Sequence, residues 1–403
     1  MSSHPTRILD DWLDSYLAFT EGQESPEKLH IWTAIALLSA SLKRQVWMDR
    51  GYYQLFTNVY VLIVAESGEV RKSASMDIGM PILLEAVKDI HTMSDSLTSE
   101  GLIKHMNRIT VHINLEEPDK PIKMTDSHLF IHADELASLF SFDKQRASKM
   151  TMILTTLYGS RDRYEHTTKG DGKVVTFNNY ITLIAATDPR NLRVLPEEAI
   201  GGLLGRLVFI TAHERRALIA WPEMTKERLK IRSDLVHDLT LISKIKGEMK
   251  PTPGARQLFA DWYESINSKK IEDSHIKAFM ARCHDTALKV AMLIAVSRSN
   301  ELTLTETHMK GGITFIEKLM PEVARVISWT ANTTFSQNKA KFIDLLRRHG
   351  GYLSYKQMLN LMSVNRDEFV MLINTLSEDG TLKLPIRNVK GVAVLELIDE
   401  LNR

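Results

Sequence analysis

Short apolar runs alternate with amphipathic stretches along the first half of this chain. Residues 8–45 carry apolar side chains at helical spacing, and Ser25-Pro26-Glu27 within them is a helix-start signal. Several later runs have the length of buried strands. Because strands that alternate with helices are typical of a parallel sheet covered on both faces, the pattern predicts an α/β core. The predicted strands lie at residues 45–49, 59–64, 129–133, 180–187 and 207–211.

The second half of the chain is mostly helical in pattern. Apolar positions keep helical spacing from Trp221 to about residue 335, with a break at Pro251-Thr-Pro-Gly254. The remaining residues predict three helices and then a strand pair, which is the order of a winged helix-turn-helix. The predicted parts are a helical N-terminal region at 1–50, an α/β core at 51–220, a helical lid at 221–335 and a winged-helix-like domain at 336–403.

The composition is that of an ordinary globular protein, since 44% of the 403 residues are hydrophobic and 25% are charged. The formal net charge is +1, so any affinity for nucleic acid must come from local basic patches. A single cysteine, Cys283, excludes a disulfide framework and a thiolate zinc cluster. The chain has neither a signal-peptide pattern nor an apolar run of the length that a bilayer requires. We therefore expect a cytoplasmic protein without a membrane partner.

The most informative segment lies between residues 59 and 75. An apolar strand runs into a short polar turn that ends in Lys72-Ser73 and continues as a helix. This is the layout of a phosphate-binding P-loop, in which backbone N–H groups, a helix N-terminus and a lysine meet a polyphosphate while the serine hydroxyl binds Mg²⁺. Two usual glycines are replaced by Glu66 and Arg71, and Gly68 is the only glycine of the turn. The alternative is a buried strand that ends in a solvated turn.

Further polar groups stand at the ends of the other predicted strands. Asp134 and Glu135 follow the strand at 129–133, where in a P-loop ATPase the aspartate orients Mg²⁺ and the glutamate polarises the attacking water. Thr187 ends the next strand, at the sheet edge where ligands of open α/β sheets lie. Arg206 precedes the last strand and is a candidate to stabilise charge at a neighbouring subunit's nucleotide. The simpler alternatives are a chance acidic pair, a strand-terminal turn and a helix-capping arginine.

With these motifs in this order, the chain resembles the AAA+ ATPases, and among them the phage- and plasmid-encoded replication ATPases with helicase-like roles. The turn Ser67-Gly-Glu-Val-Arg-Lys-Ser73 is similar to the variant of that group in which arginine replaces the last glycine. The segment Gly205-Arg-Leu-Val-Phe209 is similar to the arginine-finger region of the minichromosome maintenance helicases. The resemblance covers roughly residues 30 to 300.

The resemblance implies ATP and Mg²⁺ as ligands of an AAA+-type core. It implies catalytic roles for Lys72, Asp134, Glu135, Thr187 and Arg206, with Ser73 and Asp134 as metal ligands. The residues that it implies for nucleotide binding are Ser67, Gly68, Glu69, Val70, Arg71, Lys72, Ser73, Ala74 and, from the helical lid, Arg282. Glu66 near a polyphosphate is electrostatically unfavourable and Arg71 crowds the backbone, so slow or absent hydrolysis is also consistent with the loop.

A basic hairpin is predicted between the acidic pair and the strand at 180–187. Lys169-Gly-Asp-Gly-Lys173 has the turn signal of a hairpin tip. By resemblance to AAA+ helicases, Lys169 and Lys173 contact DNA phosphates in the pore of a ring, with Arg161, Arg163 and His166 near the hairpin base. Such contacts give salt-dependent binding without sequence preference. The alternative is a solvated hairpin whose lysines discourage edge pairing.

These features predict an ATP-dependent DNA translocase or replicative helicase of a phage or mobile element. The expected form is a homo-oligomeric ring, a hexamer, that works on single-stranded or duplex DNA with other replication proteins. The main alternative is a helicase loader or DNA-binding adaptor that uses ATP as an assembly switch with weak or no hydrolysis. A third is a DNA-binding scaffold whose P-loop is vestigial.

Overall fold

The computed structural model describes residues 6–93, 98–108, 111–112, 123–124, 127–140, 144–168, 172–194, 202–268, 274–330, 334–362, 364–378, 381–387 and 393–397. These residues form two compact units, which divide between Ile327 and Ser328. Each unit is described here by itself. Among the described residues, no helix combines the length and the apolar character that crossing a membrane requires.

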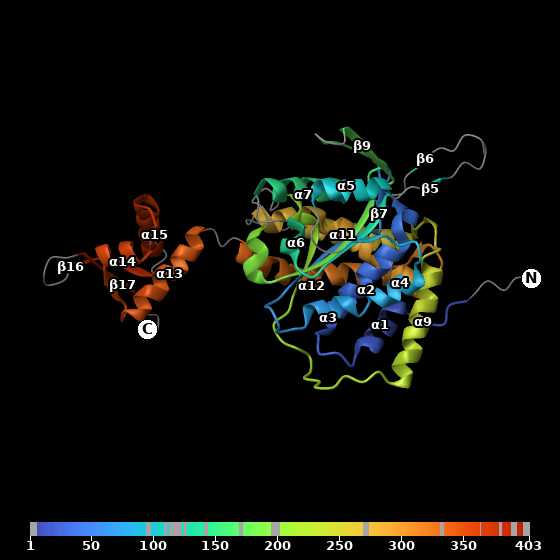
Figure 1. The fold of residues 1–403 in the computed structure, drawn as a ribbon, viewed down its shortest axis with the longest axis horizontal. Helices are drawn as coiled ribbons and strands as arrows, with labels where there is room; N and C mark the ends of the chain where they lie inside the picture. Colours follow the sequence, from blue (N-terminus) through green and yellow to red (C-terminus); the bar gives the residue numbers. More distant parts are fainter. Residues whose placement is uncertain are drawn as a thin grey trace, which may run out of the picture. The chain divides into compact units, whose positions relative to one another are not determined.

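A five-stranded sheet in which all strands are parallel forms the centre of the first unit (Figure 1). Its strand order is β11-β3-β10-β7-β4, so β10 lies between the strand that leads into the P-loop-like turn and the strand that leads into the acidic pair. Every residue of the three central apolar runs on β3, β10 and β11 is buried, which explains their continuous hydrophobicity. The strands are β3 (Tyr60–Val64), β4 (Thr92–Met93), β7 (His128–Ala133), β10 (Tyr180–Thr187) and β11 (Leu207–Thr211).

Helices of the same unit surround the sheet (Figure 1). The predicted N-terminal helices are α1 (Trp12–Thr20) and α2 (Glu27–Leu42), and α2 begins directly after the Pro26 start signal. α2 is buried along most of its length because it packs against α1, β3 and β10. The other helices are α3 (Lys72–Asp77), α4 (Met80–Ala86), α5 (Ser99–Arg108), α6 (Leu136–Phe140), α7 (Lys144–Leu157), α9 (Lys226–Ile242), α10 (Pro253–Asn267), α11 (Ser274–Arg298) and α12 (Glu306–Thr330).

Smaller sheets of two or three strands lie outside the parallel sheet. β8 (Arg163–Thr168) and β9 (Gly172–Phe177) form the predicted antiparallel hairpin. The predicted strand at 45–49 is β1 (Val46–Asp49), but it belongs to a separate three-stranded sheet and not to the parallel one. Its partners are β2 (Gln54–Phe56) and β12 (Gly247–Glu248), and the remaining pairs are β5 (Val111–His112) with β6 (Lys123–Met124) and β13 (Lys250–Pro251) with β14 (Thr303–Leu304).

Within its described residues, the second unit has three complete helices and a three-stranded antiparallel sheet of order β15-β17-β16. Phe342, Leu346, Met358, Phe369 and Leu372 are fully buried in its core. The sequence pattern missed β15, because three residues are too few for an alternation to show. The elements are α13 (Thr334–Arg348), β15 (Tyr352–Ser354), α14 (Tyr355–Met362), α15 (Arg366–Glu378), β16 (Leu382–Arg387) and β17 (Ala393–Leu397).

The prediction of an α/β protein with a parallel sheet is therefore confirmed.

A buried polar cluster joins this sheet to α2. The hydroxyl of Tyr180 donates to the carbonyl of Ser39 at 2.9 Å and lies 3.0 Å from the hydroxyl of Thr57. The Ser39 hydroxyl also lies 2.7 Å from that of Thr182. These bonds satisfy polar groups at the interface between the helix and the sheet.

We expect Tyr180→Phe to lower the free energy of unfolding of the first unit by about 1–3 kcal/mol, because Ser39 and Thr57 lose a buried hydrogen-bond partner. Urea unfolding followed by tryptophan fluorescence measures the change. Tyr52→Phe is the matched control, since Tyr52 is fully exposed and should unfold like the wild type. Equal stability of Tyr180→Phe and the control would show that the cluster contributes nothing.

Candidate functional site at the carboxyl edge of the sheet

The register of the parallel sheet brings the predicted strand-end residues to one edge. Thr187 pairs with Val64 on β3, and Val64 pairs with Thr211 on β11. On the other side of β10, Ala185 pairs with Ala133, so Glu135 comes level with Thr187. The hydroxyl of Thr187 donates to Glu135 Oε1 at 2.8 Å. The structure thus brings Thr187 and Glu135, two of the predicted catalytic residues, into direct contact.

Lys72 is the first residue of α3, and it faces the same edge. Its half-buried ammonium donates to the carbonyl of Ala65, at the end of the preceding strand. Burial lowers the pKa of Lys72, while the carboxylates of Asp188 and Glu135 act on it in the opposite direction. A lysine at the start of a helix is the group that a phosphate-binding loop presents to a polyphosphate, whereas the two carboxylates beside it disfavour a polyanion.

Asp188 is a site residue whose role sequence reasoning missed. Its Oδ2 accepts a hydrogen bond from the backbone N–H of Ser67 at 3.1 Å, so a carboxylate holds an amide that a P-loop directs at phosphate. Arg190 donates to both oxygens of Asp188 at 2.8 Å. The Arg190 guanidinium lowers the pKa of Asp188, and the backbone bonds add to this effect. The sequence predicts a role for Thr187, with a strand-terminal turn as the alternative, and the contact of Asp188 with Ser67 becomes visible only in the tertiary structure.

Side chains from other segments of the chain hold the turn of residues 65–71 in place. Arg71 has a left-handed backbone with φ of +55°, at the position where a P-loop has its last glycine. Its side chain donates to Glu24 at 2.9 Å, and its carbonyl accepts from the Ser25 hydroxyl at 3.1 Å. Arg215 also binds the turn, by donating to the carbonyls of Gly68 and Glu69 at 3.0 and 2.8 Å. The N-terminal region and the segment after β11 therefore clamp the loop.

The predicted nucleotide-binding residues of the loop and of the first turn of α3 differ in exposure. Ser67, Gly68 and Glu69 form the exposed part of the loop, and Gly68 takes a left-handed φ of +80° with open space around it. The side chain of Val70 is fully buried and can offer only its backbone. Ser73 is half-buried and Ala74 exposed on the first turn of α3. The loop fits a polyphosphate in part, because phosphate must displace the Asp188 carboxylate from Ser67.

Asp134 lies on the opposite side of β7 from Glu135, as strand alternation predicts. It is grouped with Asp77 at the end of α3 and with His132 on β7. Burial raises the pKa of Asp77, and the nearby charge of Asp134 raises it further. Ser73 stands one helical turn before Asp77 on α3, so these two residues share a face of that helix.

Arg206 and Arg282 lie at the other edge of the sheet. Arg206 directly precedes β11, so about 17 Å of strand separates it from Thr211 at the carboxyl edge. The two arginines line one cavity of about 330 Å³, together with Tyr158, Arg161 and Lys289. α11 carries Arg282 to this amino edge, at the opposite end of the sheet from Lys72. The arginine that α12 brings to the carboxyl edge is Arg325, which donates to the Thr211 hydroxyl at 2.8 Å.

The amino-edge cavity holds a buried amine. Lys289 Nζ donates to the carbonyl and to the side-chain oxygen of Asn58, both at 2.9 Å, and it lies 3.8 Å from the ring centre of Tyr158. Burial lowers the pKa of Lys289 to about 7, although Asp285 acts against this shift. Arg206 is near enough to disfavour the charged amine further.

The hairpin of β8 and β9 presents both signs of charge. Arg161 and Arg163 are exposed and His166 is partly buried. Lys173 pairs with Glu165 at 2.8 Å, and Arg163 pairs with the same carboxylate. The predicted cations are present, but one acidic side chain holds two of them. Lys169 lies outside the described residues.

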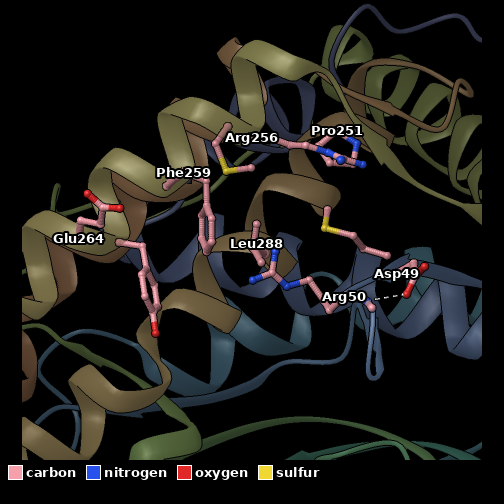
Figure 2. Close-up of a pocket in the computed structure, with 12 residues that line it drawn as sticks. Asp49, Arg50, Pro251, Arg256, Phe259, Glu264 and Leu288 are labelled. Atoms are coloured by element: carbon pink, nitrogen blue, oxygen red, sulfur yellow. Dashed lines mark hydrogen bonds between the residues drawn. The ribbon is translucent and has the colours of Figure 1, made fainter.

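A second cavity, of about 600 Å³, lies away from these groups (Figure 2). It is bordered by the turn after β1 and by α10 and α11. Figure 2 shows Arg50 facing Phe259, with the guanidinium carbon 5.2 Å from the ring centre. None of the residues predicted for nucleotide or DNA binding lines this cavity.

No protein-family model matches the chain, and no curated protein matches it. Function is therefore inferred from the chain's own residues. Of the predicted site residues, Lys72, Glu135 and Thr187 meet at the carboxyl edge of the sheet. Arg206 and Arg282 meet at its amino edge.

The stability of the protein should depend on pH through Lys289. In the unfolded chain this amine stays charged up to its ordinary pKa of 10.5, whereas in the fold it loses its proton near pH 7. The unfolded state therefore binds more protons between these values, and stability rises with pH. Relative to Lys289→Met, we expect the wild type to gain up to about 1.4 kcal/mol per pH unit between pH 7 and 10.

Urea unfolding of both proteins across this pH range measures the difference. Lys88→Met is the control for loss of one positive charge, because Lys88 is exposed. A difference between wild type and Lys289→Met that does not change with pH would contradict the assigned burial of the amine.

Proposed function

We propose that the chain binds ATP with Mg²⁺ at the turn of residues 65–73 and uses it to act on DNA. The observation that carries this proposal is the convergence of Lys72, Glu135 and Thr187 at the carboxyl edge of a parallel sheet. Ligands of open α/β sheets bind at this edge. In a β10-centred sheet, Thr187 lies between the loop and the acid, where one hydroxyl can contact both phosphate and Glu135.

The proposed roles follow from position. Lys72 and the loop amides would hold the β- and γ-phosphates, and Ser73 with Asp134 would hold Mg²⁺, which supplies charge neutralisation at the phosphates when bound. Glu135 would orient and deprotonate the attacking water, with its carboxylate fixed by the Thr187 hydroxyl. Arg325 from the lid helix α12 would add a cation at the same edge.

Arg206 supports a ring in which neighbouring subunits share sites. It lies at the edge opposite Lys72, so it cannot complete the site of its own chain. An arginine in this place would act on a neighbour's nucleotide, and Arg282 in the same cavity would add a second cation. We therefore propose an AAA+-like homo-oligomer, with a hexamer as the expected form.

DNA is the proposed partner because exposed cations gather on the β8–β9 hairpin. The second unit, with its order of helix, strand, two helices and two strands, is proposed to be a winged helix. The favoured function is an ATP-dependent translocase or replicative helicase of a phage or mobile element. The second candidate is a loader or adaptor with weak hydrolysis, and the carboxylate of Asp188 on Ser67 favours it.

Nucleotide binding and turnover separate these candidates. We expect Lys72→Ala to abolish ATP binding in a fluorescent-nucleotide assay, because the loop loses its buried cation. Glu135→Gln should still bind ATP, with hydrolysis lowered by about 10²–10⁴-fold because the water loses its base. Lys88→Ala is the control for the lysine change. Equal hydrolysis by the wild type and Glu135→Gln, with ATP bound by both, would establish the loader or adaptor, and absence of ATP binding by the wild type would establish a vestigial loop.

DNA binding should depend on the charge balance of the hairpin. We expect Glu165→Gln to tighten binding of a single-stranded oligonucleotide, because Arg163 and Lys173 are released from their shared carboxylate. Lys173→Ala should weaken binding and reduce the slope of log affinity against log salt by about 0.7, which is the loss of one phosphate contact. Fluorescence anisotropy across a salt series measures both.

Glu301→Gln is the control for removal of an exposed negative charge elsewhere on the first unit. If Glu165→Gln and Glu301→Gln change the affinity equally, the effect is one of net charge and the hairpin is not the contact surface.

A further inference from the structure

Three metal-ligating side chains meet beside the candidate nucleotide loop. His132 and Asp134 are two residues apart along β7 and its end, so they lie on the same face, and Asp77 approaches them from the last turn of α3. One ligand atom from each residue lies within 4.8 Å of the others. His132 Nε2 lies 3.4 Å from Asp77 Oδ1.

The imidazole nitrogen is the second observation that points to a ligand. Nε2 of His132 is buried and makes no hydrogen bond with the residues that the structure describes, although it lies at ion-pair distance from Asp77 Oδ1. A buried nitrogen without a hydrogen bond costs free energy unless a ligand satisfies it. The two carboxylates also repel each other, and a cation between the three groups would relieve both penalties.

We propose that Asp77, His132 and Asp134 bind a divalent transition-metal ion such as Zn²⁺ or Mn²⁺. One imidazole nitrogen and two carboxylate oxygens suit these ions, whereas Mg²⁺ is a hard cation that takes oxygen ligands. Ligand bonds of about 2.0–2.2 Å place ligand atoms about 3.4 Å apart around a tetrahedral ion. Side-chain adjustments on the order of 1 Å would therefore close the set, and a fourth position would remain for water.

The site is separate from the proposed nucleotide chemistry except at Asp134. Asp77 and His132 have no role in ATP binding as proposed, and Glu135 stays on the other side of the strand with Thr187. A metal ion here would fix the end of α3 to the end of β7, and so set the distance between the helix that begins at Lys72 and the acidic pair. Binding of this ion requires no nucleotide.

The test is titration of the full chain with Zn²⁺ in the absence of nucleotide, followed by isothermal calorimetry. We expect one site per chain, weakened more than about tenfold in His132→Ala and in Asp77→Asn. Asp77 is 57% exposed, so Asp77→Asn keeps the test valid if His132→Ala disturbs the fold. His237→Ala is the matched control, because His237 lies 2.8 Å from the single carboxylate of Asp238.

Glu135→Gln and Lys72→Ala should bind Zn²⁺ like the wild type, so failure of the ATP proposal leaves this one intact. Millimolar Mg²⁺ should not displace the bound ion. Unchanged Zn²⁺ affinity in Asp77→Asn, or an effect of His237→Ala as large as that of His132→Ala, would overturn the proposal. Complete displacement by Mg²⁺ would also overturn it, because the carboxylates would then form an ordinary Mg²⁺ site.

Discussion

The pairing of β10 with β3 on one side and β7 on the other brings Thr187 and Glu135 together at the candidate site. Thr187 lies beside the end of β3, where the loop begins, and level with Glu135 beyond the end of β7. Side chains alternate along a strand, so a register slip of one residue would turn Thr187 away from Glu135. It would also exchange the faces on which Asp134 and Glu135 lie. Because β3 and β10 are completely buried, the hydrophobic core itself enforces this register.

The same burial explains how much could be predicted from the sequence. A strand that is buried on both faces is a continuous apolar run, and such runs predicted β10 and β11 to the residue and β3 to within one. The strand-end positions of Glu135 and Thr187 followed directly. Alternation also placed His132 with Asp134, but the approach of Asp77 depends on how α3 packs, which no local pattern contains.

For the same reason, the sequence pattern could not predict contacts between distant segments. The bond from Ser67 to Asp188 spans 121 positions, and Glu24 meets Arg71 across 47. The position of Arg282 beside Arg206 was also unpredictable, because helical spacing cannot tell which end of the sheet a long helix reaches. The short strands β4 and β15 carry too few residues for an alternation to be visible.

The missing glycines of the loop can now be understood through the groups that replace them. Arg71 holds a left-handed backbone that costs a non-glycine residue about 1–2 kcal/mol, and its contacts with Glu24 and Ser25 offset this strain. The loop conformation is therefore maintained by tertiary contacts and not by glycine. Those contacts leave Lys72 directed at the carboxyl edge, while Asp188 occupies an amide that phosphate would need. A phosphate would have to compete with the intramolecular carboxylate of Asp188 for the Ser67 amide, so a loop with the shape of a P-loop need not bind a polyphosphate tightly.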